Sequence, residues 1–191
     1  MKSRRKIIRV AVFTIISTFL VSCGDETVPK PQAYLRLDYP IEDNHVMYDG
    51  TCPFTFEFNS QSIMKSKGNC NFTLEYPKMK GTIHLTYKPV SDNIEVLLRD
   101  AQKLTYEHVI KANTIKELPF SNGLENVHGM FYQVGGNAAT NAQFYVTDST
   151  NHFLTGSIYF HTKPNYDSIM PAVSYIKEDM QNIMETIKWK K

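Results

Sequence analysis

Several ingredients of enzyme and metal sites are scarce in this sequence. Only three cysteines occur among 191 residues, and none stand in the C-x-x-C spacing of zinc ribbons and thiol redox sites. No glycine-rich loop precedes a helix, and Gly156-Ser157-Ile158 lacks the second glycine of a nucleophile elbow. No apolar run reaches the ~20 residues that a membrane-spanning helix needs. These absences argue against a hydrolase, a nucleotide-binding enzyme and a protein with a transmembrane helix.

The histidines also follow no ligand spacing. Neither H-x-H nor H-E-x-x-H occurs, and the one glycine pair, Gly135-Gly136, stands between two expected strands, where it predicts a turn. His108 falls on the apolar stripe of an expected helix and is most simply a residue at the edge of the core. We therefore expect no enzyme, no catalytic residue, no metal site and no cofactor. The histidines are His45, His84, His108, His128, His152 and His161.

The positive charge of the chain is concentrated at its start. The formal charge is +2, from 21 basic and 19 acidic residues, and five of the basic ones lie between Lys2 and Arg9. Without residues 1–22 the chain has 16 basic and 19 acidic residues, a net charge of −3, so no nucleic-acid partner is expected. The remaining 169 residues suffice for one domain with a hydrophobic core.

The first residues have the layout of a secretory signal peptide. A basic segment precedes the apolar run over residues 10–21, which ends in Leu20-Val21-Ser22-Cys23. This tetrapeptide resembles the bacterial lipobox, in which the cysteine thiol receives a diacylglyceryl group and the chain is cut just before it. Cys23 is thus the predicted lipidation site, and the alternative is a spacer cysteine in an uncleaved anchor or an ordinary signal peptide.

Lipidation would place the protein in the cell envelope. Each buried CH₂ of an acyl chain, such as palmitate, contributes ~0.8 kcal/mol to membrane binding, so a triacylated Cys23 holds the protein on a bilayer. Asp25 and Glu26 follow directly, either as a weak surface-export signal or as part of a solvated tether. We expect the periplasmic face of a membrane rather than the cell surface. The predicted organisation is a signal peptide at 1–22, a lipidated tether at 23–32 and a single domain at 33–191.

The other two cysteines are Cys52 and Cys70. Outside the cytoplasm, two unmatched thiols in a small domain usually pair, so we expect a Cys52–Cys70 disulfide. A redox or metal-binding role for the two thiols is the alternative.

Alternation of apolar and polar residues predicts strands in the first half of the domain, and the intervening segments 41–50 and 59–69 are polar and predict loops. Three successive strands suggest an antiparallel meander. Helical spacing then predicts a helix capped by Ser91 that runs to about Ala112 and covers one face of the sheet. The strands are expected at 33–39, 51–58, 71–76 and 81–87. The helix carries the stripe Ile94, Leu97, Leu98, Ala101, Leu104 and His108.

Strand signals return in the second half, separated by turn sequences such as Asn122-Gly123. A last helix follows, capped by Asp167 or Ser168 with Pro171 near its first turn, and Asp179 lies outside its apolar stripe. The strands are expected at 114–120, 127–134, 143–147 and 153–160, and the stripe is Ile169, Val173, Ile176, Met180, Ile183 and Ile187.

This element order predicts an α+β fold, an antiparallel sheet with two packed helices, by analogy of the Mog1/PsbP-like kind. Tyrosine and phenylalanine together number 22, so many of them must be core residues. Tyr34, Tyr132 and Tyr145 fall on the outward side of their strands and form either a recognition surface or a second buried face.

The chain resembles the gliding-motility lipoprotein GldD family of Bacteroidetes. The resemblance is carried by the lipobox, by PKPQAYLRLDYP at 29–40, by GGNAATNAQFYVTD at 135–148, by residues 153–160, and by IKEDM at 176–180 with Trp189. None of these stretches is a catalytic signature, and Cys23 is the one functional residue that the resemblance transfers.

The resemblance implies a non-catalytic lipoprotein required for gliding motility and type IX protein secretion, acting with other gliding-motility lipoproteins such as GldJ. The alternative function is a small-ligand-binding envelope lipoprotein, which would need a concave pocket lined by some of the aromatic side chains. A filled core with a flat aromatic or charged patch would favour the interaction protein.

Overall fold

The computed structural model describes residues 44–106, 112–136, 138–161 and 166–190. The lipobox, the tether, Tyr34 and the strand expected over 33–39 lie outside these ranges. In chain order the described elements are β1 (His45–Tyr48), β2 (Phe54–Asn59), β3 (Ile63–Gly68), β4 (Asn71–Tyr76), the 3-10 turn η1 (Pro77–Met79), β5 (Gly81–Pro89), α2 (Ile94–Tyr106), β6 (Ala112–Asn122), β7 (Val127–Gly136), β8 (Thr140–Thr147), β9 (His152–Phe160), α3 (Tyr166–Thr186) and β10 (Lys188–Trp189).

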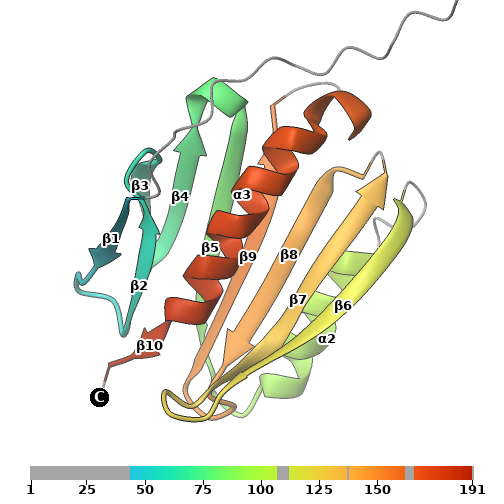
Figure 1. The fold of residues 1–191 in the computed structure, drawn as a ribbon. Helices are drawn as coiled ribbons and strands as arrows, with labels where there is room; N and C mark the ends of the chain where they lie inside the picture. Colours follow the sequence, from blue (N-terminus) through green and yellow to red (C-terminus); the bar gives the residue numbers. More distant parts are fainter. Residues whose placement is uncertain (1–43, 107–111, 137, 162–165, 191) are drawn as a thin grey trace, which may run out of the picture. The chain divides into compact units, whose positions relative to one another are not determined.

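Seven of these strands form one antiparallel sheet in the order β3-β4-β5-β9-β8-β7-β6 (Figure 1). The strands β6 to β9 are successive hairpins, as their turn sequences predict. The last of them, β9, pairs with β5 in a register that runs from Gly81↔Phe160 to Pro89↔His152. This long-range ladder joins the two halves of the chain into one sheet.

A second, three-stranded sheet has the order β1-β2-β10. Its central strand β2 buries Phe54 and Phe56 completely, in keeping with the alternation in the sequence. The C-terminal β10 pairs with one side of β2, and β1 pairs with the other. The predicted meander of three strands is therefore wrong in its first member, because β2 lies in the small sheet and the meander is β3-β4-β5.

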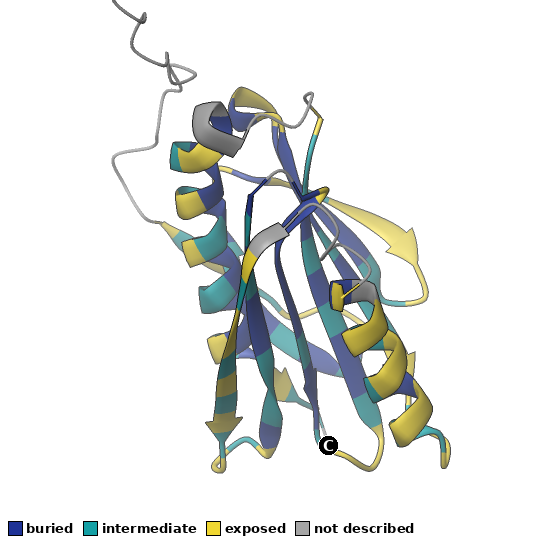
Figure 2. Cartoon of the chain, turned by 90° about the vertical axis from the view of Figure 1, so that its right-hand side faces the viewer, coloured by how far each residue is buried: buried dark blue, intermediate teal, exposed yellow. Residues whose placement is uncertain are grey.

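The two helices lie on opposite faces of the large sheet (Figure 2). All six residues of the predicted α3 stripe are buried, and four of them, Ile176, Met180, Ile183 and Ile187, belong to the main hydrophobic core. That core fills the space between α3, the small sheet and the inward residues of β4, β5, β8 and β9. The prediction of an α+β fold with an antiparallel sheet and two packed helices is confirmed.

On the other face, α2 packs over β7, β8 and β9 with a more polar contact. Leu97 is buried there, and the Thr105 hydroxyl donates a hydrogen bond of 2.9 Å to Oε1 of Gln143 on β8. A small cavity of about 30 Å³ lies beneath the helix. This face therefore carries hydroxyl, amide and tyrosine side chains where the α3 face carries aliphatic and aromatic ones.

Five predicted element boundaries are wrong. The loop expected over 59–69 contains β3, and the loop expected over 41–50 contains β1. The first helix begins after Asn93, whose carbonyl accepts from the backbone N–H groups of Val96 and Leu97, so Ser91 is not its cap. The strand β6 starts at Ala112, so that helix ends before it. The last helix begins at Tyr166, which places the expected caps Asp167 and Ser168 inside it.

Candidate functional site

The predicted lipidation site, Cys23, lies outside the described residues, and its acylation stays a prediction from the sequence. The other candidates from the sequence lie within the described ranges, with the exception of His108 and Tyr34.

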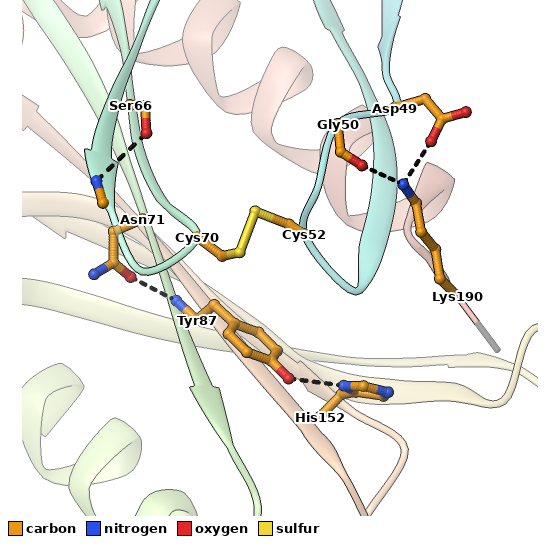
Figure 3. The surroundings of a disulfide bond; sticks show 10 residues. Asp49, Gly50, Cys52, Ser66, Cys70, Asn71, Tyr87, His152 and Lys190 are labelled. Atoms are coloured by element: carbon orange, nitrogen blue, oxygen red, sulfur yellow. Dashed lines mark hydrogen bonds and ion pairs between the residues drawn. A yellow bond between two sulfur atoms is a disulfide. The ribbon is translucent and has the colours of Figure 1, made fainter.

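The predicted pairing of Cys52 and Cys70 is present as a disulfide (Figure 3). It joins the segment before β2 to the tight turn between β3 and β4, across a Cα–Cα distance of 5.6 Å. The turn residues Asn69 and Cys70 both have positive φ, 51° and 58°. Cys52 is buried and belongs to the main core. The disulfide thus fastens the small sheet to the edge of the large one.

Polar contacts also hold the two segments that the disulfide joins. The ammonium of Lys190 lies 2.6 Å from a carboxylate oxygen of Asp49 and donates to the carbonyl of Gly50 (Figure 3). Asn71 accepts a hydrogen bond from the backbone N–H of Tyr87, and the Tyr87 hydroxyl lies 2.9 Å from Nδ1 of His152. These contacts tie the C-terminal strand and the disulfide loop to one end of the sheet.

Removal of the disulfide should destabilise the fold without changing its topology. The two cysteines are 18 residues apart, and in the chain-entropy model a loop of this length stabilises by about 3 kcal/mol. The double variant Cys52→Ala/Cys70→Ala should lose about this free energy of unfolding in urea titrations of non-reduced protein. Wild-type protein in excess reductant should show a matching loss. A double variant as stable as the non-reduced wild type would contradict a structural role for the disulfide.

A buried carboxylate connects α3 to the small sheet. Asp179 is 4% exposed and accepts hydrogen bonds from Nδ2 of Asn59 at 3.2 and 3.1 Å. Nε2 of His45 lies 3.7 Å away, and Asn59 Nδ2 also lies 2.9 Å from the Tyr175 hydroxyl. Burial and the nearby Asp179 carboxylate raise the pKa of Tyr76. We call Asp179, Asn59, His45, Tyr76 and Tyr175 the Asp179 cluster.

Asp179 lies outside the apolar stripe of α3, as the sequence predicts, and is nevertheless buried. The residue lies beside that stripe, and β1 and β2 cover it. Each oxygen of its carboxylate is engaged within the fold, which is the arrangement that keeps a buried charge tolerable. The Asp179 cluster therefore positions the small sheet.

The face of the large sheet opposite α3 carries an open polar groove of about 400 Å³ over β3, β4 and β5. We call this the polar groove and define it by side chains that project from alternate positions of the three strands and from the residue after β9. The Thr82 hydroxyl lies 3.0 Å from Nε2 of His161, and the ring of His84 meets Tyr159 edge-on. The defining residues are Lys67, Asn71, Thr73, Glu75, Thr82, His84, Thr86 and His161.

The histidines are spread over the described residues, and His84 and His161 together line the polar groove. No group of three or more histidine, cysteine, aspartate or glutamate side chains within the described ranges is placed to hold a metal ion. His128 lies 3.0 Å from the Ser121 hydroxyl and 3.2 Å from Oδ1 of Asn126, a serine–histidine–asparagine chain. These contacts are exposed to solvent on a hairpin, and no described cavity includes them.

The two outward tyrosines within the described ranges do not form the recognition surface that the sequence left open. Tyr132 is 2% exposed, and both Tyr132 and Tyr145 line the small cavity beneath α2. Burial raises the pKa of both hydroxyls. Tyr132 belongs to a second buried face of the sheet, and Tyr145 is half-buried beside it.

The fold and its cross-link define the class of the protein. An antiparallel sheet between two helices, with a disulfide fastening its edge, is typical of a domain that folds in an oxidising compartment. Within the described residues, neither helix combines the length and the apolar character needed to cross a bilayer.

A family model described as gliding motility lipoprotein GldD matches residues 24–189. The chain therefore belongs to this family, which confirms the resemblance seen in the sequence. No curated protein matches it. As a member of a lipoprotein family, it is a membrane-associated protein of the cell envelope.

Proposed function

We propose that this lipoprotein is a non-catalytic component required for gliding motility and type IX protein secretion. In this proposal an acylated Cys23 anchors it to the periplasmic face of a membrane, and it acts by contact with other gliding-motility lipoproteins such as GldJ. The family match over residues 24–189 carries the proposal, because it begins directly after Cys23 and extends through the folded domain. The arrangement of the Asp179 carboxylate supports a structural role, since its oxygens are engaged by Asn59 and His45 within the fold.

The test is complementation of a chromosomal deletion in the native bacterium. The deletion should abolish spreading on surfaces and retain C-terminally tagged secretion cargo inside the cell, and the wild-type gene should restore both. Cys23→Ala should not restore them, should take up no radiolabelled palmitate, and should accumulate as a precursor or leave the membrane fraction, because the acyl chains supply the anchor.

Ser22→Ala is the matched control, because it keeps a small residue before the cysteine and should be processed as the wild type is. A deletion strain that spreads and secretes normally would disprove the proposed function. Membrane-bound, palmitate-labelled Cys23→Ala protein would instead disprove the anchor.

A further inference from the structure

The polar groove lies on the sheet face that bears α2, beside the strands that the helix covers. The helix packs over β7, β8 and β9, while the groove spans β3, β4 and β5 toward the other edge of the sheet. Figure 1 shows α2 behind β6 and β7, away from these strands. At about 400 Å³ the groove falls within the usual size of small-ligand sites.

The groups in the groove that can carry positive charge outnumber the negative ones. Lys67, His84 and His161 come from three different parts of the chain and converge on it. Glu75 is the acidic residue in its lining, and the ammonium of Lys65 binds that carboxylate at 2.6 Å. The hydrogen bond from Lys65 holds the pKa of Glu75 below its usual range. The Glu75 carboxylate is thus already paired with Lys65. Lys67, His84 and His161 line the groove beside it, with Nε2 of His161 3.0 Å from the Thr82 hydroxyl.

A buried hydroxyl provides a second, independent observation. Thr73 lines the groove between Lys65 and His84 in the strand register, and it is 4% exposed. Its hydroxyl has no hydrogen-bond partner among the described residues. Buried polar groups in native proteins are nearly always paired, so this hydroxyl has capacity for a further hydrogen bond, to an ordered water or to an anion in the groove.

The cationic groups also repel one another. Burial lowers the pKa of His84, and the neighbouring His161 and Lys67 lower it further, while Glu75 acts in the opposite direction. The ring of Tyr159 is the other group that faces this imidazole. An anion in the groove would relieve this repulsion and favour the protonated imidazole.

We propose that the polar groove binds a phosphate group through Lys67, His84 and His161. A phosphate presents oxygens in several directions, which matches donors that approach from β3, from β5 and from the end of β9, whereas a carboxylate presents only two oxygens in one plane. The source is either free phosphate or a phosphorylated sugar headgroup. The inference rests on the groove alone and is independent of the proposed role in secretion.

Calorimetric titration of the mature lipoprotein in uncharged detergent tests the proposal. Inorganic phosphate and glucose 6-phosphate are the probes, and glucose is the neutral control. Both phosphates should bind and glucose should not. Equal affinity for the two phosphates would assign the site to free phosphate, and tighter binding of the sugar phosphate would assign it to a headgroup.

Lys67→Gln and His84→Gln should each weaken phosphate binding by about tenfold or more, the usual effect of losing one charge-assisted hydrogen bond. Lys116→Gln is the matched control, because this exposed lysine lies on β6 at the far edge of the sheet and should bind as the wild type does. Thermal unfolding of each variant checks that the fold is kept. An absence of binding by both phosphate probes, or unchanged affinity in Lys67→Gln and His84→Gln, would overturn the proposal.

Discussion

The variant Gly129→Ala should fold poorly or not at all. Gly129 lies in β7, between the neighbouring strands β6 and β8. A Cβ atom at this position would meet the backbone carbonyl oxygen of Tyr145 and a methyl group of Val146 on β8. A backbone carbonyl in a ladder cannot rotate away as a flexible side chain can, so the two strands would have to separate. We expect a loss of about 3 kcal/mol or more in the free energy of unfolding.

Gly123→Ala is the matched control for this prediction. Gly123 lies in the turn between β6 and β7, and an added Cβ would have no atom within 4 Å. Its stability should therefore be unchanged or higher by up to about 1 kcal/mol, because alanine restricts the unfolded chain. Urea unfolding of the wild type and the two variants makes the comparison. A Gly129→Ala variant as stable as Gly123→Ala would contradict the close approach of β7 and β8.

Strands were predictable from the sequence where apolar and polar residues alternate along the strand. In β5, Ile83 and Leu85 enter the core while Thr82, His84 and Thr86 face the opposite side, as the alternation indicates. The same reasoning located the buried stripe of α3. In β5 and α3 the apolar residues at regular spacing face the same core, so the periodicity of the sequence is enough to identify them.

The missed strands lack that local signal. The edge strand β3 has the sequence Ile-Met-Lys-Ser-Lys-Gly and is mostly exposed, so it carries no buried stripe. Lysines on an exposed edge strand protect that strand from pairing with other chains. They also interrupt the alternation of apolar and polar residues by which a strand is predicted. The short β1 and β10 exist because each pairs with β2, which is a long-range property of the fold.

The polar groove shows the same limit for the candidate site. Thr82 and His161 are 79 residues apart in the chain and are brought together by the pairing of β5 with β9. The sequence places His84 on an outward face but does not say which strand lies beside it. The disulfide was predictable because only two cysteines remain after Cys23, so the pairing needed no knowledge of the topology.

Loss of the buried carboxylate in Asp179→Ala should also be strongly destabilising. The carboxylate accepts two hydrogen bonds from the Asn59 amide, which also donates to the Tyr175 hydroxyl, and it lies 3.7 Å from His45. Alanine would leave the buried Asn59 amide with the Tyr175 hydroxyl in place of three acceptor atoms, beside the buried Tyr76 hydroxyl. A buried pair that loses one member costs about 3 kcal/mol or more, and we expect a loss of this size in urea unfolding. The small sheet should loosen first, because Asn59 ends β2.

Glu178→Ala provides the matched control, because Glu178 is the neighbouring acidic residue of the same helix and is exposed. Its stability should remain within about 0.5 kcal/mol of the wild type. A double-mutant cycle of Asp179→Ala with Asn59→Ala measures the interaction energy between the two side chains. If they stabilise the fold through their mutual hydrogen bonds, the second substitution should cost much less once the first is present. If the two losses simply added, Asp179 and Asn59 would be acting independently, and their hydrogen bonds would not be what holds the small sheet to α3.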